Sequence, residues 1–354
     1  MTRVAIVGGG IAGVSAAAKL APYFDVTVFE AENTVGYHAS GRSAAMFDES
    51  YGNITVRTLN TASKLALEAA EVLSPRKILL VALPGDEAAF AASLEQIDMT
   101  EISPNRARGL VPIISPDVTY AAIYERSYDI DTDQLLQSYA KQTRANGANI
   151  RTAAPIQQIT KAGCWTLISG TERFQADIIV NAAGAWADNI ADLAGVSPLG
   201  LQPYRRSMAR MAAPGGHDAH HWPMLFGAGE SWYAKPDAGG WIISPAEEDP
   251  MQPMDAWADD MVLAEGIARY QPHVTEPVTR ITANWAGLRT FAPDRSLVIG
   301  QDPTIPGFYW CAAQGGYGFQ TAPAASDLLA ATITGSTPAI PMDAVRALSP
   351  ARFR

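Results

Sequence analysis

Residues 4–21 read VAIVGGGIAGVSAAAKLA, and this segment carries the strongest structural signal in the chain. Four consecutive apolar residues, 4–7, predict a buried strand. Three glycines follow, and the alanine-rich run 11–21 predicts a helix. Residues 26–29 predict a second strand, which ends at Glu30. A strand, a glycine turn, a helix and a strand within about 30 residues form the unit that binds dinucleotides.

The glycines of this segment fit the pattern G-x-G-x-x-G with Gly8, Gly10 and Gly13. The first glycine permits the tight turn, the second lets a pyrophosphate approach the backbone, and the third lets helix and strand pack closely. The phosphates then lie at a helix N-terminus, where unpaired N–H groups and the helix dipole favour negative charge. The pattern therefore predicts a phosphate site at the start of the first helix.

Glu30 lies 22 residues after Gly8, at the end of the second predicted strand. A carboxylate in that place accepts hydrogen bonds from the hydroxyls of an adenosine ribose. The alternative is a glycine-rich turn followed by a surface glutamate. Because the glycines stand between a predicted strand and a predicted helix, we favour the dinucleotide site, although the motif alone does not separate FAD from NAD.

The bulk properties limit the classes of protein. A chain of 354 residues suits two domains, and 48% hydrophobic with 18% charged residues is typical of a packed globular enzyme. The formal net charge of −10 argues against a nucleic-acid partner, which needs clustered Lys and Arg. Two distant cysteines and a short run of histidines at 217–221 do not form a spaced metal motif, so we expect no metal.

We expect a cytoplasmic protein without a transmembrane segment. The apolar run at the N-terminus ends in glycines after four residues, which is not typical of a signal peptide. No stretch approaches the roughly 18 consecutive apolar residues that a membrane-spanning helix needs.

The rest of the chain alternates between helical and strand patterns. Asp131-Thr132-Asp133 is a plausible cap for a helix over 131–146, with acids near its positive end. Further helices are predicted over 54–73 and from about residue 321. Strands are predicted over 149–183, 204–213, 222–245, 278–291 and 308–313, and a glycine loop over 314–318.

Several segments resemble the D-amino-acid-oxidase-like flavoproteins, a family that includes glycine oxidase, sarcosine oxidase and bacterial D-amino-acid dehydrogenases. GYHASGRSAA (36–45) resembles the flavin-contacting loop, DIIVNAAG (177–184) a second dinucleotide-side strand, and residues 307–330 the closing glycine loop and helix. The resemblance covers essentially the whole chain and is closest to the bacterial FAD-dependent D-arginine dehydrogenases. The segments that carry it are GYHASGRSAA, DIDTDQL, VNAAGAWAD, GVSPLGLQPYRRS, WPML, NWAGLRTF and WCAAQGGYGFQT.

The resemblance implies an α/β fold like that of glutathione reductase and D-amino-acid oxidase. A Rossmann-type FAD-binding domain would take residues 1–75, 135–205 and 285–354, and an α+β, mixed-sheet substrate domain would take 76–134 and 206–284. The sarcosine-oxidase branch attaches its flavin through a cysteine, and the matching stretch GLRTF (287–291) has none, so FAD would be held non-covalently. The implied cofactor-binding residues are Gly8, Gly10, Ile11, Ala12, Gly13, Glu30, Ala31, Ser40, Arg42, Ser43, Ala44, Ala45, Ile156, Ala182, Gly184, Trp186, Arg289, Gly315, Gly316, Tyr317, Gly318 and Gln320.

The same resemblance implies that Arg206 and Arg289 clamp a substrate carboxylate. Guanidinium groups match carboxylates in a two-bond geometry that lysine lacks. Tyr233 and Tyr51 would add hydroxyl donors or close the pocket, and Gln320 would face the substrate amine or the flavin edge. For the arginines the alternative is a surface or interdomain salt bridge, and Arg205 is the neighbour that could be mistaken for Arg206. For Gln320 the alternative is a structural role.

The chain departs from the D-arginine dehydrogenases where that group has a glutamate for the substrate guanidinium. The matching position is Ile78, and an isoleucine cannot pair with a cation. Together with Met46, Met224 and Phe226 it predicts an apolar pocket for a neutral side chain. Asp48 or Glu49, in the loop before Tyr51, is the alternative source of an acid for a cationic substrate.

The expected activity is oxidative deamination of a D-amino acid, with hydride transfer from Cα to flavin N5, giving a 2-oxo acid and ammonia. The D configuration follows from the resemblance alone. An oxidase of glycine, sarcosine or another secondary amine, a 2-hydroxy-acid dehydrogenase, and a protein that holds flavin without catalysis remain as alternatives. The acceptor that reoxidises the flavin, oxygen or a quinone-type molecule, stays open.

Overall fold

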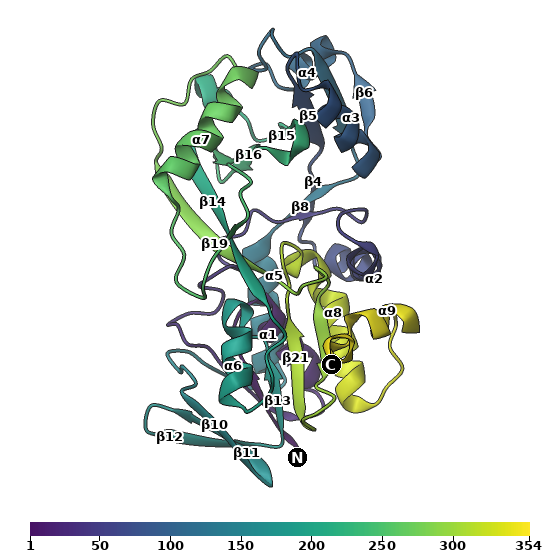
Figure 1. The fold of residues 1–354 in the computed structure, drawn as a ribbon, viewed down its shortest axis with the longest axis vertical. Coiled ribbons are helices and arrows are strands. Elements are labelled where there is room, and N and C mark those ends of the chain that lie inside the picture. The colour runs from purple at the N-terminus through teal and green to yellow at the C-terminus, as the bar shows by residue number, and fades with distance from the viewer.

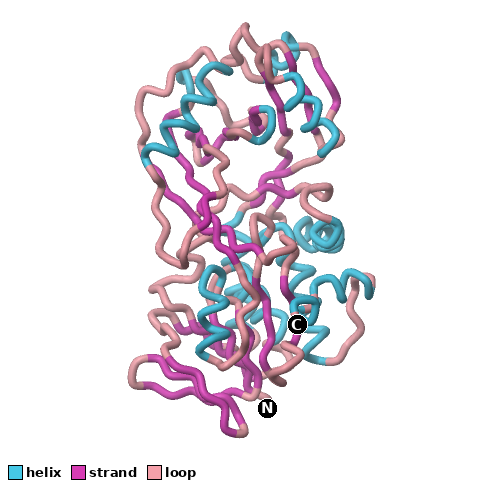
Figure 2. The backbone as a smooth tube through the Cα atoms, in the orientation of Figure 1, coloured by secondary structure: helices cyan, strands magenta, loops and turns pink.

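Two large sheets lie one above the other along the long axis of the molecule (Figure 1). The computed structural model describes the backbone of all 354 residues and every side chain except that of Gln96. Figure 2 shows the same view with strands running through both halves and helices around them. Among the described helices, none is both long and apolar enough to cross a bilayer.

The lower sheet is built around the N-terminal strand. Its six strands follow the order β20-β21-β13-β1-β2-β9, and all neighbours are parallel except β20 and β21. The strands are β1 (Arg3–Val7), β2 (Asp25–Phe29), β9 (Asn149–Arg151), β13 (Ile178–Asn181), β20 (Val298–Gln301) and β21 (Phe308–Ala312). This topology confirms the predicted dinucleotide-binding unit and the α/β fold class.

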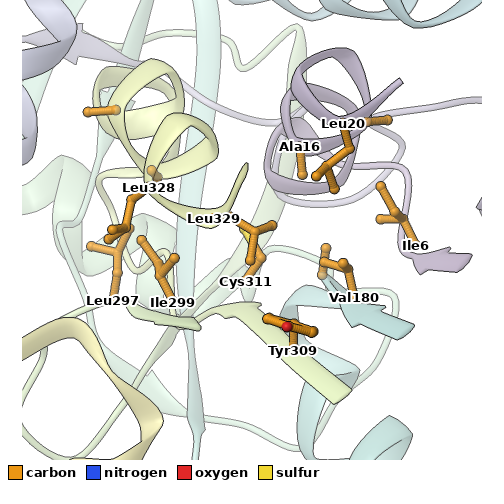
Figure 3. Close-up of a cluster of buried hydrophobic side chains, with 14 of the residues drawn as sticks. Ile6, Ala16, Leu20, Val180, Leu297, Ile299, Tyr309, Cys311, Leu328 and Leu329 are labelled. Carbon is orange, nitrogen blue, oxygen red and sulfur yellow. The ribbon is translucent and has the colours of Figure 1, made fainter. Parts of the chain in front are cut away.

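Helices α1 (Ile11–Leu20) and α8 (Gly318–Thr334) pack beside each other on this sheet. Helix α5 (Thr132–Ala145) packs against α1 and β9, and α2 (Ile54–Ala69) packs against α8. Figure 3 shows Ala16 and Leu20 of α1 and Leu329 of α8 above Val180 and Cys311 of the sheet. All five side chains are at most 2% exposed. The many alanines of α1 let the helix approach the strands closely, and the glycine turn at residues 8–10 places the N-terminus of α1 directly after the carboxyl end of β1.

The upper sheet is mixed. Its path is β18-β14-β17-β16-β15-β5-β7-β6, with β19 paired to β14, and β5 and β15 are its parallel pair. The strands are β5 (Ile78–Ala82), β6 (Thr100–Ile102), β7 (Tyr120–Tyr124), β14 (Gln202–Ala212), β15 (Met224–Gly227), β16 (Tyr233–Asp237), β17 (Gly240–Ser244), β18 (Asp249–Pro250) and β19 (Ala283–Phe291). Helices α3 (Glu87–Gln96), α4 (Pro104–Leu110) and α7 (Asp260–Tyr270) accompany it.

Two small sheets complete the fold. One consists of β10 (Gln158–Ala162), β11 (Cys164–Ser169) and β12 (Glu172–Ala176), and it lies at the lower end of the molecule (Figure 1). The other joins β3 (Met46–Phe47), β8 (Tyr128–Ile130) and β4 (Leu73–Pro75) between the two large sheets. Helices α6 (Ala187–Leu193) and α9 (Met342–Leu348) follow β13 and α8 in the chain.

A long antiparallel ribbon of β14 and β19 connects the upper and lower halves (Figure 1). Its register runs without a break from Gln202 opposite Phe291 to Arg210 opposite Ala283. Arg206 stands opposite Gly287 and Arg289 opposite Tyr204. Because side chains alternate between the faces of a strand, Arg206 and Arg289 share one face of the ribbon and Arg205 takes the other.

The structure corrects several predicted elements. The helix predicted over 54–73 ends at Ala69, and the helix predicted from about residue 321 begins three residues earlier, at Gly318. Helices α3, α4 and α7 were not predicted, because short helices with Gly or Pro inside or beside them give weak periodicity. Asp131 caps α5 as predicted, since its side chain accepts a hydrogen bond from the Gln134 N–H. The division into two domains stays a prediction, and β14 and β19 each cross one of its boundaries.

Candidate active site

The turn between β1 and α1 is closed by contacts that only glycine permits. Gly8 has a φ of +110°, and a Cβ there would lie 2.4 Å from the carbonyl oxygen of Ala182. A Cβ on Gly13 would lie 1.9 Å from the carbonyl oxygen of Gly8. The turn, the first turn of α1 and the loop after β13 are therefore packed backbone against backbone.

Ser40 lies over the start of α1. Its Oγ accepts a hydrogen bond of 3.0 Å from the Ile11 N–H and would lie 3.1 Å from a Cβ on Gly10. Gly10, Ile11 and Ala12 line a cavity with Ser40. The N-terminal end of α1 therefore opens to this cavity, as a phosphate site requires.

Glu30 is 8% exposed and holds the loops beside the glycine turn. Its Oε2 accepts a hydrogen bond of 2.7 Å from the Gly9 N–H, and its Oε1 accepts one of 2.9 Å from the Glu32 N–H. Each carboxylate oxygen keeps a further lone pair for a ribose hydroxyl. Glu30 is therefore compatible with the predicted binding of a ribose, and it also stabilises the loops around the glycine turn.

One cavity of about 230 Å³ runs from the glycine turn to the upper sheet. The sequence-predicted residues that line it are Gly10, Ile11, Ala12, Ser40, Arg42, Ser43, Ala44, Ala45, Met46, Asp48, Tyr51, Ile78, Ala182, Gly184, Arg206, Met224, Phe226, Tyr233, Arg289, Gly315, Gly316, Gly318 and Gln320. The fold thus brings residues from both large sheets to one space. The predicted residues outside this lining are Gly8, Gly13, Glu30, Ala31, Glu49, Ile156, Trp186 and Tyr317.

Arg289 is half-buried and forms no ion pair with any carboxylate among the described residues. Its guanidinium lies against the glycine loop after β21, because a Cβ on Gly316 would be 3.2 Å from Nη1. A cation in a cavity wall without its own counter-charge is arranged to receive an anionic ligand.

Arg206 also lines the cavity, but protein groups already contact its guanidinium. Nε donates a 2.9 Å hydrogen bond to the carbonyl oxygen of Glu247, and Nη2 lies 3.5 Å from Oε1 of Glu248. Glu248 is shared with Arg295, at 2.9 Å. Arg206 lies over the ring of Tyr233, with 6.0 Å between the guanidinium carbon and the ring centroid. Its charge is therefore partly balanced, in contrast to that of Arg289.

Two neighbouring arginines have structural partners. Arg205, on the opposite face of β14, lies 2.8 Å from Asp249 and does not line the cavity. Arg42 lies 2.5 Å from Asp255 and donates hydrogen bonds to two backbone carbonyls. Both of these arginines are therefore held by salt bridges within the protein.

Several polar atoms in the cavity wall lack a partner. Among the described groups, Tyr233 Oη, Thr290 Oγ1 and Gln320 Nε2 make no hydrogen bond, and their residues are 4%, 4% and 3% exposed. Buried polar atoms are normally hydrogen-bonded, so these three residues of the cavity wall each keep an unused hydrogen-bonding group.

Tyr51 lies at the rim of the cavity, with 37% of the residue exposed. Its ring packs edge-on against Tyr317 at 5.6 Å between centroids. Burial of the hydroxyl raises the pKa of Tyr51 to about 12, and the nearby charge of Arg289 opposes this shift. The hydroxyl therefore stays protonated at neutral pH and can donate a hydrogen bond to a ligand.

The sequence reasoning missed part of the lining. Met208, Glu230 and Thr290 face the cavity, as do Ile97 and Gln314. Met208 and Thr290 belong to the β14–β19 ribbon. Because residues two apart on a strand point to the same face, the position of Arg206 would have identified Met208. Glu230 stands in a short turn after β15 and has a φ of 53°, which no sequence pattern signalled.

Neither of the two cysteines lines the cavity. Cys311 is 2% exposed within the core of Figure 3, and burial raises the pKa of its thiol to about 12. Cys164 lies in β11. Neither cysteine nor histidine occurs among the described residues that line the cavity.

The fold and this site define a flavin-dependent oxidoreductase. The family model of the FAD dependent oxidoreductases (DAO) matches residues 3–332, and the chain belongs to this family. FAD is accordingly its cofactor. The glycine turn, the open start of α1 and the cavity beyond it fit this group.

Relatives in the family act on different substrates. Human mitochondrial dimethylglycine dehydrogenase is 25% identical over 348 residues, covering 88% of this chain and 40% of that protein. The chain thus spans about two fifths of that relative's length. The crystal structure of glycine oxidase from Geobacillus kaustophilus has a TM-score of 0.84 at 20% identity and covers 99% of both chains. That of L-proline dehydrogenase from P. horikoshii has a TM-score of 0.82 at 21% identity, covering 99% of this chain and 97% of the other.

Proposed function

We propose that this chain oxidises the C–N bond of an amino acid, with a D-amino acid as the substrate, and releases a 2-oxo acid and ammonia after hydrolysis of the imino acid. The observation that carries the proposal is Arg289, a half-buried guanidinium that faces the cavity without a carboxylate partner among the described residues. A substrate carboxylate supplies the missing charge in a two-bond geometry.

The side chains around Arg289 would orient this substrate. The protonated hydroxyl of Tyr51 and the unpartnered hydroxyl of Tyr233 are available as donors to the same carboxylate. Gln320 would hold the amine end or the flavin edge through its unpartnered Nε2. Arg206, partly balanced by Glu248, adds positive potential. FAD supplies the two-electron acceptor for the hydride, and the residues fix the reacting carbon in place, which is a large share of catalysis.

We propose that FAD is held non-covalently by the residues named from the sequence. The carboxyl ends of β1 and β2 and the loops after β13 and β21 bring most of these residues to the cavity. The lining, as far as its side chains are described, offers no cysteine or histidine for a covalent link.

The cavity wall at the upper sheet is apolar, and it favours a substrate whose side chain is apolar along this wall. Met46, Ile78, Met224 and Phe226 all line the cavity. Ile78 stands opposite Met224 on neighbouring strands and is 6% exposed. We therefore propose a relative of the D-arginine dehydrogenases whose pocket has lost the acid at position 78.

Replacing Ile78 by Glu is expected to shift the preference toward positively charged side chains. The new carboxylate would pair with a substrate cation, and a hydrogen bond to a charged group contributes about 1.5–3 kcal/mol. The ratio of kcat/KM for D-arginine over D-norleucine should rise roughly tenfold or more, with Ile78→Gln as the neutral control. An unchanged ratio in Ile78→Glu would place this wall away from the substrate.

Anaerobic reduction of the purified flavoprotein tests the proposed reaction. D- and L-amino acids, secondary amines and 2-hydroxy acids are compared by the loss of visible flavin absorbance. Bleaching by D-amino acids supports the proposal, and bleaching by 2-hydroxy acids alone contradicts it. Air admitted afterwards shows whether oxygen restores the colour or a quinone-type acceptor is needed.

A second candidate is oxidation of glycine, sarcosine or another secondary amine. The names of the relatives favour it, since dimethylglycine dehydrogenase, glycine oxidase and L-proline dehydrogenase refer to small or N-substituted amino acids. The same carboxylate clamp would serve these substrates. Bleaching by sarcosine or proline, but not by D-amino acids with larger side chains, would select this candidate.

A further inference from the structure

Asp48 is a buried carboxylate in the cavity wall. It follows β3, is 5% exposed and lines the cavity. Its Oδ1 accepts hydrogen bonds from the Ser50 N–H at 2.8 Å, from the Ser50 hydroxyl at 2.7 Å and from the Tyr124 hydroxyl at 2.9 Å. Three donors on one oxygen fix the orientation of the carboxylate.

The second oxygen of Asp48 is open. Within the described part of the molecule, Oδ2 accepts no hydrogen bond, yet it is not among the buried polar atoms that are sealed from solvent without a partner. No Lys, Arg or His of the described residues forms an ion pair with Asp48, whereas the neighbouring Glu49 pairs with Lys64. Because a buried charge is costly without a counter-charge, the cavity side of Asp48 is arranged to receive a cation.

The charges around the cavity single out one complementary pair. Arg42 and Arg206 have protein carboxylates beside them, and Glu230 is exposed to water. Arg289 and Asp48 are the lining residues that face the same space with opposite, unpaired charges, as far as the described residues show. A ligand that carries both a carboxylate and a positively charged nitrogen balances both.

The anchors of Asp48 place it on the substrate side of the cavity. Tyr124, which holds Oδ1, stands opposite Ile78 in the pairing of β5 with β7. The Asp48 N–H donates a 3.3 Å hydrogen bond to Oε1 of Gln320, the residue whose Nε2 lacks a partner. Asp48 therefore stands between the apolar wall of Ile78 and the start of α8.

We infer that Asp48 binds a positively charged nitrogen of the substrate, an inference that rests on the proposed amino-acid oxidation and deepens it. The nitrogen is either the amine at the reacting carbon or a cation at the end of the side chain, since both are alkylammonium groups. An anion without such a nitrogen, such as a 2-hydroxy acid, leaves Asp48 unbalanced. Asp48 is thus a specificity-determining residue, and in the case of a side-chain cation it supplies the counter-charge that Ile78 cannot.

The test compares D-lysine, D-norleucine and hexanoate, a series in which one nitrogen is removed at each step. Their affinities for the oxidised holoenzyme are measured from perturbation of the flavin spectrum and, for ligands that react, from the concentration dependence of anaerobic bleaching. In the wild type, at least one nitrogen should strengthen binding. Asp48→Asn should weaken binding of the ligand with that nitrogen roughly 10- to 100-fold and leave hexanoate unchanged. Glu49→Gln is the matched control and should leave all three unchanged.

The outcomes separate the two nitrogens and the two proposals. A loss confined to D-lysine assigns Asp48 to the side-chain end, and an equal loss for D-lysine and D-norleucine assigns it to the amine. Asp48→Asn with wild-type affinity for all three ligands overturns the inference. The inference is also overturned if neither nitrogen strengthens binding to the wild type. This comparison of wild-type affinities remains decisive if the variant fails to retain FAD. If the wild type binds the amines through Asp48 but is never bleached, the proposed function fails and the inference stands.

Discussion

Arg289→Met is expected to lower kcat/KM roughly 30- to 5,000-fold, which corresponds to a loss of about 2–5 kcal/mol of transition-state binding. Methionine preserves the aliphatic volume and removes the guanidinium. The loss is large because the carboxylate of a bound substrate would then be desolvated without a counter-charge. Steady-state kinetics with the best substrate, together with the flavin spectrum of the purified variant, measure the effect.

Two variants control this result. Arg289→Lys keeps the charge but not the two-bond geometry, so it should recover only part of the activity. Arg205→Lys changes the neighbouring arginine on the opposite face of β14, whose partner is Asp249, and should leave KM unchanged. If Arg289→Met kept wild-type kcat/KM, the carboxylate clamp would have to lie elsewhere.

Gly13→Ala is expected to yield protein with little or no bound FAD and a lower midpoint of thermal unfolding. The added Cβ would lie 1.9 Å from the carbonyl oxygen of Gly8, so α1 must shift away from the turn. Overpacking of this kind costs about 1–3 kcal/mol, and backbone on both sides leaves no flexible side chain to yield. The ratio of flavin to protein absorbance and a thermal melt report the two effects separately.

Gly109→Ala in α4 is the control for this substitution. A Cβ at Gly109 has no heavy atom within 4 Å, and the residue lies within a helix. Alanine there should stabilise the protein by about 0.5–1 kcal/mol and leave the FAD content unchanged. Full FAD occupancy in Gly13→Ala would show that α1 and the turn are less tightly coupled than the packing indicates.

Local sequence was sufficient for the elements whose determinants are contiguous. The glycine turn is defined by the strand before it and the helix after it, and Asp131 needs only its own helix to act as a cap. The proposed substrate residues lay beyond composition and periodicity, because Arg206 and Arg289 are 83 positions apart and meet only through strand pairing. The two arginines were assigned to one site by the resemblance to known flavoproteins and not by any local pattern.

The charge balance of individual residues could not be predicted from the sequence, because it depends on contacts between distant parts of the folded chain. Asp48 and Glu49 are adjacent acids in one loop and were equal candidates, but Tyr124 from β7 holds the first in the cavity wall while Lys64 of α2 pairs with the second. Likewise, the difference in free charge between Arg206 and Arg289 arises from Glu248, whose approach depends on the turn after β17. Charge balance within a cavity is a property of the folded chain.

The β14–β19 ribbon has a consequence for recombination between relatives. Arg206 and Arg289 lie on two strands of the upper sheet that extend toward the lower half and are paired from Gln202 to Arg210. In a chimaera that exchanged only the upper half, the crossover points would fall within β14 and β19. Each strand would then contain residues from both parents, and their pairing would no longer be that of either parent. Successful crossovers must therefore keep the ribbon from a single parent, so the proposed substrate half would be exchanged only together with the proposed arginine clamp.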